Sequence, residues 1–156
     1  MLEVEIVGVY DGQSHQQGPT HPVVHLRHED RVLPIVVGIP EAQAIQVGLL
    51  EEKLGRPMTH DLVCNILAGL RAELESVTIY KLENDTFYAH LNLSQKNAAG
   101  EIEQLVRVDS RPSDGIAIAV RARCPIYVAE EVMDTAGVEA HASEPEEPEE
   151  EDDSDD

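Results

Sequence analysis

Two short segments of the chain carry residue types that suit hydrolysis of a phosphodiester. Residues 56–62 read RPMTHDL and residues 109–116 read DSRPSDGI, so each places Arg-Pro, a hydroxyl residue and an aspartate before an apolar run. Aspartates beside an imidazole suit a divalent cation such as Mg²⁺ or Mn²⁺, and guanidinium groups hold phosphate oxygens with forked hydrogen bonds. A metal that bridges carboxylates and phosphate activates water and stabilises the growing charge.

Each residue of the two segments has a candidate role in that chemistry. The candidate catalytic residues are His60, Asp61 and Asp114, of which the histidine can transfer protons near neutral pH. The candidate metal ligands are Asp61, Asp109 and Asp114, and the candidate phosphate-binding residues are Arg56 and Arg111. Because the segments lie about 50 residues apart, only the fold can bring them together.

The same residues have a structural interpretation. Thr59 and Ser113 are suitable N-caps, and Asp61 and Asp114 would then lie in the first helical turn, where the helix dipole favours negative charge. Under this interpretation the arginines pair with the aspartates, and the protein is a non-catalytic regulatory or assembly module. Both interpretations stay open at the level of sequence.

Apolar periodicity predicts the elements that must position these residues. The expected strands cover residues 2–6, 23–28, 32–37, 76–82, 87–93, 102–109 and 125–129. The expected helices cover residues 40–54 with Gly55 as C-terminal cap, 59–70, a third from Ser113, and 130–136 with Gly137 as cap. In the second helix, the expected buried stripe consists of Leu62, Val63, Ile66, Leu67 and Leu70.

This order of elements predicts the fold class. Strands are followed by a helical hairpin, then by more strands and a further helix, without strict alternation of strand and helix. The expected fold is therefore α+β, with a largely antiparallel or mixed sheet on which the helices pack. Because strands at the edge of such a sheet need partners, a homodimer is also expected.

The charge of the chain limits its partners and location. The chain has 156 residues and a formal charge of −20, and residues 144–156 hold ten acidic residues and no basic one. Residues 138–156 are expected to be a disordered acidic tail. The high negative charge disfavours binding of nucleic acid. The absence of a signal peptide or long apolar run predicts a cytoplasmic protein that does not enter membranes.

The two segments also carry a family resemblance. With the opening strand, residues 33–38 (LPIVVG) and the helix that starts EAQAI at residue 41, they resemble the bifunctional nuclease domain family over residues 1–137. The family typically has Leu where Met58 stands and Ala where Gly115 stands. The resemblance implies an α+β domain and a nuclease acting on DNA and RNA, but it assigns no catalytic residue.

Overall fold

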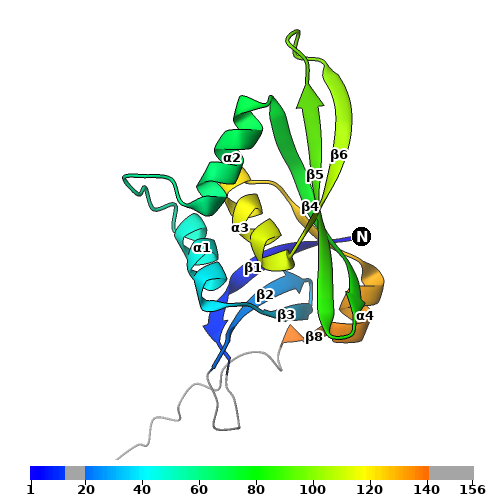
Figure 1. The fold of residues 1–156 in the computed structure, drawn as a ribbon. Coiled ribbons are helices and arrows are strands. Elements are labelled where there is room, and N and C mark those ends of the chain that lie inside the picture. The colour runs from blue at the N-terminus through cyan, green and yellow to red at the C-terminus, as the bar shows by residue number, and fades with distance from the viewer. Residues whose placement is uncertain (13–19, 141–156) are drawn as a thin grey trace, which may run out of the picture.

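The computed structural model describes residues 1–12 and 20–140, which form one sheet with helices packed on it (Figure 1). The strands are β1 Leu2–Asp11, β2 Pro22–His28, β3 Arg31–Val36, β4 Ala72–Glu83, β5 Thr86–Lys96, β6 Ile102–Ser110, β7 Ile126–Val128 and β8 Val138–Glu139. The helices are α1 Ile39–Leu49, α2 Thr59–Gly69, α3 Pro112–Ala122 and α4 Glu130–Ala136. The predicted α+β class is confirmed.

The sheet has the strand order β6-β5-β4-β7-β1-β2-β3-β8. All neighbouring strands pair antiparallel except β4 and β7, which pair in parallel. The short strand β7 therefore joins the long β4–β5–β6 ribbon to the β1–β2–β3 unit. Helices α1, α2 and α3 lie together on one side of the long strands (Figure 1).

The core forms where the apolar faces of the strands meet α1 and α3. Leu26, Leu33, Ile45, Ile79 and Ile116 are completely shielded from solvent. Along β5 the predicted alternation holds, because Ala89, Leu91 and Leu93 are buried. Burial of these side chains is the main favourable term that holds α1 and α3 against the sheet.

Two tight turns contain residues with a left-handed backbone. Asn84 and Asp85 connect β4 to β5 with φ of 52° and 59°. Two consecutive positive φ angles are typical of the two-residue hairpin turn whose twist matches that of the strands. Glu29 has φ of 53° between β2 and β3, so both predicted hairpins are confirmed.

The structure corrects the predicted end of the first helix. Helix α1 ends at Leu49, and Glu51, with φ of 52°, turns the chain away from it. Leu54 and Gly55 therefore lie in the connection to α2 and do not extend or cap α1. The apolar spacing of Leu50 and Leu54 mimics helical periodicity, but both side chains are exposed and find no buried surface that would keep them helical.

The predicted N-caps are also wrong. The N-cap residues of α2 and α3 are Met58 and Arg111, which places Thr59 and Pro112 at the first helical position. Neither cap residue satisfies its helix with a side-chain hydrogen bond. Proline is favoured at the first helical position because its missing N–H has no partner there anyway.

The largest correction concerns the apolar stripe of α2. None of its residues is buried, and Val63, Cys64 and Leu67 are half-buried against the core. The other predicted core residues face outward, since Leu62, Ile66 and Leu70 are 50%, 51% and 58% exposed. Helix α2 thus has an inner and an outer apolar face.

The carboxyl end of the described chain extends the sheet slightly past the predicted boundary. Strand β8 pairs with β3 through Val138 and Glu139. The remainder of the predicted acidic tail, residues 141–156, lies outside the described residues. Among the helices of the described ranges, none has the length and apolar character needed to cross a membrane.

A close approach of α1 to α3 at Gly48 generates a stability prediction. A Cβ added at Gly48 would lie 2.5 Å from Cγ2 of Val120 and 2.9 Å from Nη1 of Arg121. We expect Gly48→Ala to lower the free energy of unfolding by about 1–3 kcal/mol, because overpacking forces neighbouring groups apart. Urea denaturation followed by circular dichroism measures this change.

A matched control separates crowding from the effect of glycine on the unfolded chain. A Cβ at Gly55 would meet nothing within 4 Å, and its φ is not in the left-handed region. Gly55→Ala removes the same backbone freedom, so it is expected to leave stability unchanged or slightly raised. Equal destabilisation by both changes would show that α1 and α3 do not approach closely at Gly48.

Candidate functional site

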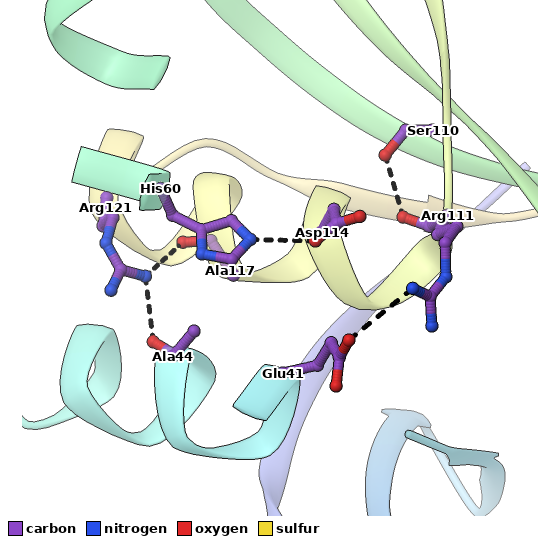
Figure 2. A network of polar contacts seen from close by, with 8 residues as sticks. All are labelled: Glu41, Ala44, His60, Ser110, Arg111, Asp114, Ala117 and Arg121. Carbon is purple, nitrogen blue, oxygen red and sulfur yellow. Dashed lines mark hydrogen bonds and ion pairs between the residues drawn. The ribbon is translucent and has the colours of Figure 1, made fainter. Parts of the chain in front are cut away.

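The structure brings the two Arg-Pro segments together at the starts of α2 and α3. His60 is the second residue of α2, and Asp114 is the third residue of α3. The ring Nε2 of His60 lies 2.9 Å from Oδ1 of Asp114 (Figure 2). Two residues 54 positions apart therefore form a hydrogen-bonded pair.

The side chains of His60 and Asp114 differ in their exposure to solvent. The His60 side chain is 13% exposed, and that of Asp114 is 41% exposed. A carboxylate has only acceptor oxygens, so Nε2 carries the proton of this hydrogen bond and donates it. The contact fixes the ring orientation and leaves Nδ1 as the nitrogen that can gain or lose a proton.

Asp61 has a different set of contacts from Asp114. Its Oδ2 accepts a hydrogen bond of 2.9 Å from the backbone N–H of Met58, and its Oδ1 accepts one of 2.8 Å from Nε of Arg121. The backbone hydrogen bond from Met58, and after it the hydrogen bond from Arg121, lower the pKa of Asp61 below its ordinary value. Both oxygens of Asp61 thus stabilise the start of α2.

Arg121 connects all three helices of this side. Its Nη1 donates to the carbonyl oxygen of Ala44 in α1 at 2.9 Å and to that of Ala117 in α3 at 2.7 Å (Figure 2). Its Nε reaches Asp61 in α2 at 2.8 Å, and its side chain is only 9% exposed. Buried guanidinium groups are stable only when they are paired and hydrogen-bonded.

Sequence reasoning did not predict the role of Arg121. Its position near the end of α3 suggests a favourable interaction with the helix dipole, which needs no burial. The sequence does contain one indication of this role. Arg121 lies four residues after Ala117 and seven after Asp114, so the three residues share one face of α3. An arginine on the same helix face as the candidate catalytic aspartate is therefore a candidate for a contact directed into the protein.

The remaining predicted site residues lie apart from the His60–Asp114 pair or make other contacts. Nη1 of Arg111 lies 3.6 Å from Oε1 of Glu41 in α1, and the Arg111 side chain is largely exposed (Figure 2). Arg56 is exposed in the connection before α2 and has no ion pair within residues 1–12 and 20–140. Asp109 is in register with His90 on β5 and faces away from the side where Ser110 and the helices lie.

These positions test whether the predicted metal ligands fit a metal ion. Among the described residues, no group of three or more His, Cys, Asp or Glu side chains is arranged to hold one. Asp61 is engaged at both oxygens, and Asp109 projects from the opposite face of β6. The described side chains therefore do not form a metal site by themselves, and Mg²⁺ or Mn²⁺ stays a prediction.

The two cysteines are unsuited to nucleophilic attack. Burial raises the pKa of the Cys124 thiol to about 11 and raises the pKa of Cys64 as well. Both side chains therefore stay protonated near neutral pH, where only a thiolate would react efficiently. The His60–Asp114 pair is thus a better candidate for chemistry than either thiol.

The contacts of Arg121 generate a stability prediction. We expect Arg121→Met to lower the free energy of unfolding by about 2–4 kcal/mol, because it leaves Asp61 and two carbonyl groups without their donor. Arg123→Met is the control, since Arg123 is exposed and pairs with exposed Glu51. A surface pair contributes at most about 1 kcal/mol. Similar losses in both variants, measured by urea denaturation, would contradict the role of Arg121.

The lowered pKa of Asp61 predicts an acid dependence of stability. A carboxylate with a pKa lowered on folding stabilises the fold above its ordinary value of 3.8, and this contribution is lost as the pH falls through the folded pKa. Wild type is therefore expected to lose stability more steeply than Asp61→Asn below about pH 5. Unfolding midpoints measured across this range test it; a constant difference between the two proteins would show that Asp61 is unperturbed.

Comparisons with known proteins agree with the resemblance noted in the sequence. The model of the bifunctional nuclease domain matches residues 23–141. An uncharacterized protein of Mycobacterium tuberculosis is 39% identical over 140 residues, which cover 88% of this chain and 77% of that protein.

Plant relatives carry the nuclease name. Bifunctional nuclease 1 of Arabidopsis thaliana is 31% identical over 111 residues, covering 69% of this chain and 33% of the plant protein. Bifunctional nuclease 2 of Oryza sativa subsp. japonica is 27% identical over 130 residues, covering 81% of this chain and 39% of that protein. The chain thus spans between a third and two fifths of these plant proteins. Since the family model matches most of its length, the chain belongs to the bifunctional nuclease domain family.

Proposed function

We propose that the protein is a nuclease that hydrolyses phosphodiester bonds of DNA or RNA, with the His60–Asp114 pair at its reactive centre. The observation that carries this proposal is the contact of 2.9 Å between His60 and Asp114, which joins two segments far apart in sequence. Membership of the bifunctional nuclease domain family supports it, as do the plant relatives named bifunctional nucleases.

The chemistry of the pair matches the needs of phosphodiester hydrolysis. Asp114 holds the imidazole in the tautomer with the proton on Nε2. Nδ1 of His60 then takes a proton from the attacking water and afterwards gives it to the leaving oxygen, as a general base and general acid. The water oxygen forms a bond to phosphorus while the bond between phosphorus and the leaving oxygen breaks, and the proton passes from the water to the leaving oxygen through the imidazole.

Arg111 is the proposed phosphate-binding residue of the site. It directly precedes the first turn of α3, three residues before Asp114, and its guanidinium is exposed on the same side as Glu41. A planar guanidinium binds phosphate oxygens through two parallel hydrogen bonds. Its long contact of 3.6 Å with Glu41 leaves most of its donors for a substrate.

The proposed function also implies which molecules the protein binds. Nucleic acid is the proposed substrate, and a second copy of the chain is the proposed partner. The net charge of −20 repels a polyanion, so encounter is expected to be slow. A divalent cation recruited with the substrate phosphate would offset this repulsion, which gives the Mg²⁺ or Mn²⁺ prediction a physical basis outside the protein side chains.

The second candidate function is a non-catalytic regulatory or assembly module, and the contacts of Asp61 favour it. Both oxygens of this aspartate are used to hold α2 to its own cap residue and to Arg121. One of the two Arg-Pro segments therefore serves structure. If the His60–Asp114 contact likewise only fastens α2 to α3, no reaction is expected.

Cleavage of labelled single-stranded RNA and double-stranded DNA by purified full-length protein tests the proposal. We expect His60→Ala and Asp114→Asn each to lower the cleavage rate about 100-fold or more, as removal of a general acid–base group does. Parallel reactions with Mg²⁺, Mn²⁺ or EDTA test the metal. Loss of cleavage in EDTA would support a metal-dependent reaction.

Two control variants make the result specific. Asp85→Asn changes an exposed turn aspartate at the far end of the β4–β5 hairpin and is expected to cleave as fast as wild type. Asp61→Asn is expected to be less stable and, because Asp61 helps to position His60, to cleave more slowly than wild type but faster than His60→Ala. Cleavage that persists in His60→Ala would locate the reaction elsewhere, and no cleavage by wild type with any metal would favour the module.

A further inference from the structure

Helix α1 begins with a carboxylate that faces the proposed phosphate-binding residue. Glu41 is the third residue of α1, the position that Asp61 and Asp114 occupy in their own helices. Its Oε1 lies 3.6 Å from Nη1 of Arg111, the cap residue of α3 (Figure 2). Glu41 lies outside both Arg-Pro segments, so only the fold brings it to this site.

The two members of this ion pair are held to different degrees. The Glu41 side chain is 23% exposed, whereas the Arg111 side chain is 67% exposed. A Cβ added at Gly38 would collide with Oε2 of Glu41, so the carboxylate fills the space that a side chain at the cap of α1 would take. Within the described ranges, Glu41 is the one carboxylate that pairs with the Arg111 guanidinium. Glu41 is thus the fixed member of the pair, and Arg111 is the member that can move.

A carboxylate beside a phosphate-binding guanidinium opposes phosphate binding in two ways. It competes for the N–H donors of Arg111, because a guanidinium binds carboxylate and phosphate with the same fork of donors. Its negative charge also repels the incoming phosphate. At 3.6 Å the contact with Glu41 is longer than a charge-assisted hydrogen bond, which measures about 2.7–2.9 Å. Since an exposed ion pair of this kind contributes little, a phosphate can displace the carboxylate.

We propose that Glu41 is the counter-ion that holds Arg111 in the absence of substrate and releases it to a phosphate of the nucleic acid. Glu41 is thus a positioning residue, which acts through Arg111 and sets how tightly nucleic acid binds. The inference rests on the proposed function, because it requires Arg111 to bind the substrate phosphate. It does not depend on the chemistry of the His60–Asp114 pair.

Binding of labelled single-stranded RNA and double-stranded DNA, followed by fluorescence anisotropy, tests the proposal. The full-length protein carries His60→Ala in every sample, so that binding is measured without cleavage. Glu41→Gln is expected to lower the dissociation constant about 3- to 5-fold, which corresponds to the loss of one exposed ion pair. Arg111→Gln is expected to raise it at least about 10-fold. A merely structural role of Glu41 would weaken binding or leave it unchanged.

A double variant and a matched control make the result specific. In Arg111→Gln, the further change Glu41→Gln is expected to alter the dissociation constant less than about twofold, because the residue through which Glu41 acts is absent. Glu51→Gln removes the same charge just after the end of α1 and releases exposed Arg123, its partner at 2.7 Å. This control is expected to bind nucleic acid as tightly as the protein with Glu51. Equal tightening by Glu41→Gln with and without Arg111, or by Glu51→Gln, would overturn the proposal in favour of a general effect of net charge.

The remaining outcomes separate this inference from the proposed function. Tighter binding by Glu41→Gln, together with no cleavage by the protein that retains His60, would keep the inference and overturn the hydrolysis. Cleavage by wild type, together with unchanged or weaker binding in Glu41→Gln, would overturn the inference and keep the hydrolysis. No binding of RNA or DNA by any of the proteins would overturn both.

Discussion

The position of α2 depends on one buried cation, the guanidinium of Arg121. A charge this well shielded needs several partners, and it finds them on three helices: Ala44 in α1, Asp61 in α2 and Ala117 in α3. Asp61 in turn holds the first turn of α2 through Met58. Because His60 directly precedes Asp61, the contacts of Arg121 also determine where the imidazole lies.

The two Arg-Pro segments show how one local pattern serves two purposes. Asp61 and Asp114 both occupy the third position of their helices, where a carboxylate can turn back to the cap residue or reach outward. Asp61 turns back and binds Arg121, whereas Asp114 reaches across to His60. The first aspartate therefore stabilises the site, and the second orients the group that can transfer protons.

The sequence predicted local structure better than long-range contacts. The turn at Asn84 and Asp85 was predictable, because its residue types favour a tight turn, and so was the alternation along β5. The parallel insertion of β7 between β4 and β1 depends on pairing across the whole chain, which periodicity does not report. In the site, the paired motifs made a convergence of His60 with Asp114 one of two open interpretations, but the role of Arg121 was not predicted, because its partner Asp61 lies 60 residues away.

Helix α2 shows why periodicity alone could not determine burial. Its apolar residues occupy two faces, and the core covers only one, so Ile66 matched the predicted stripe as well as Leu67 did. With no fully buried residue, α2 gains little from the hydrophobic effect within one chain and is held by the polar contacts of His60 and Asp61.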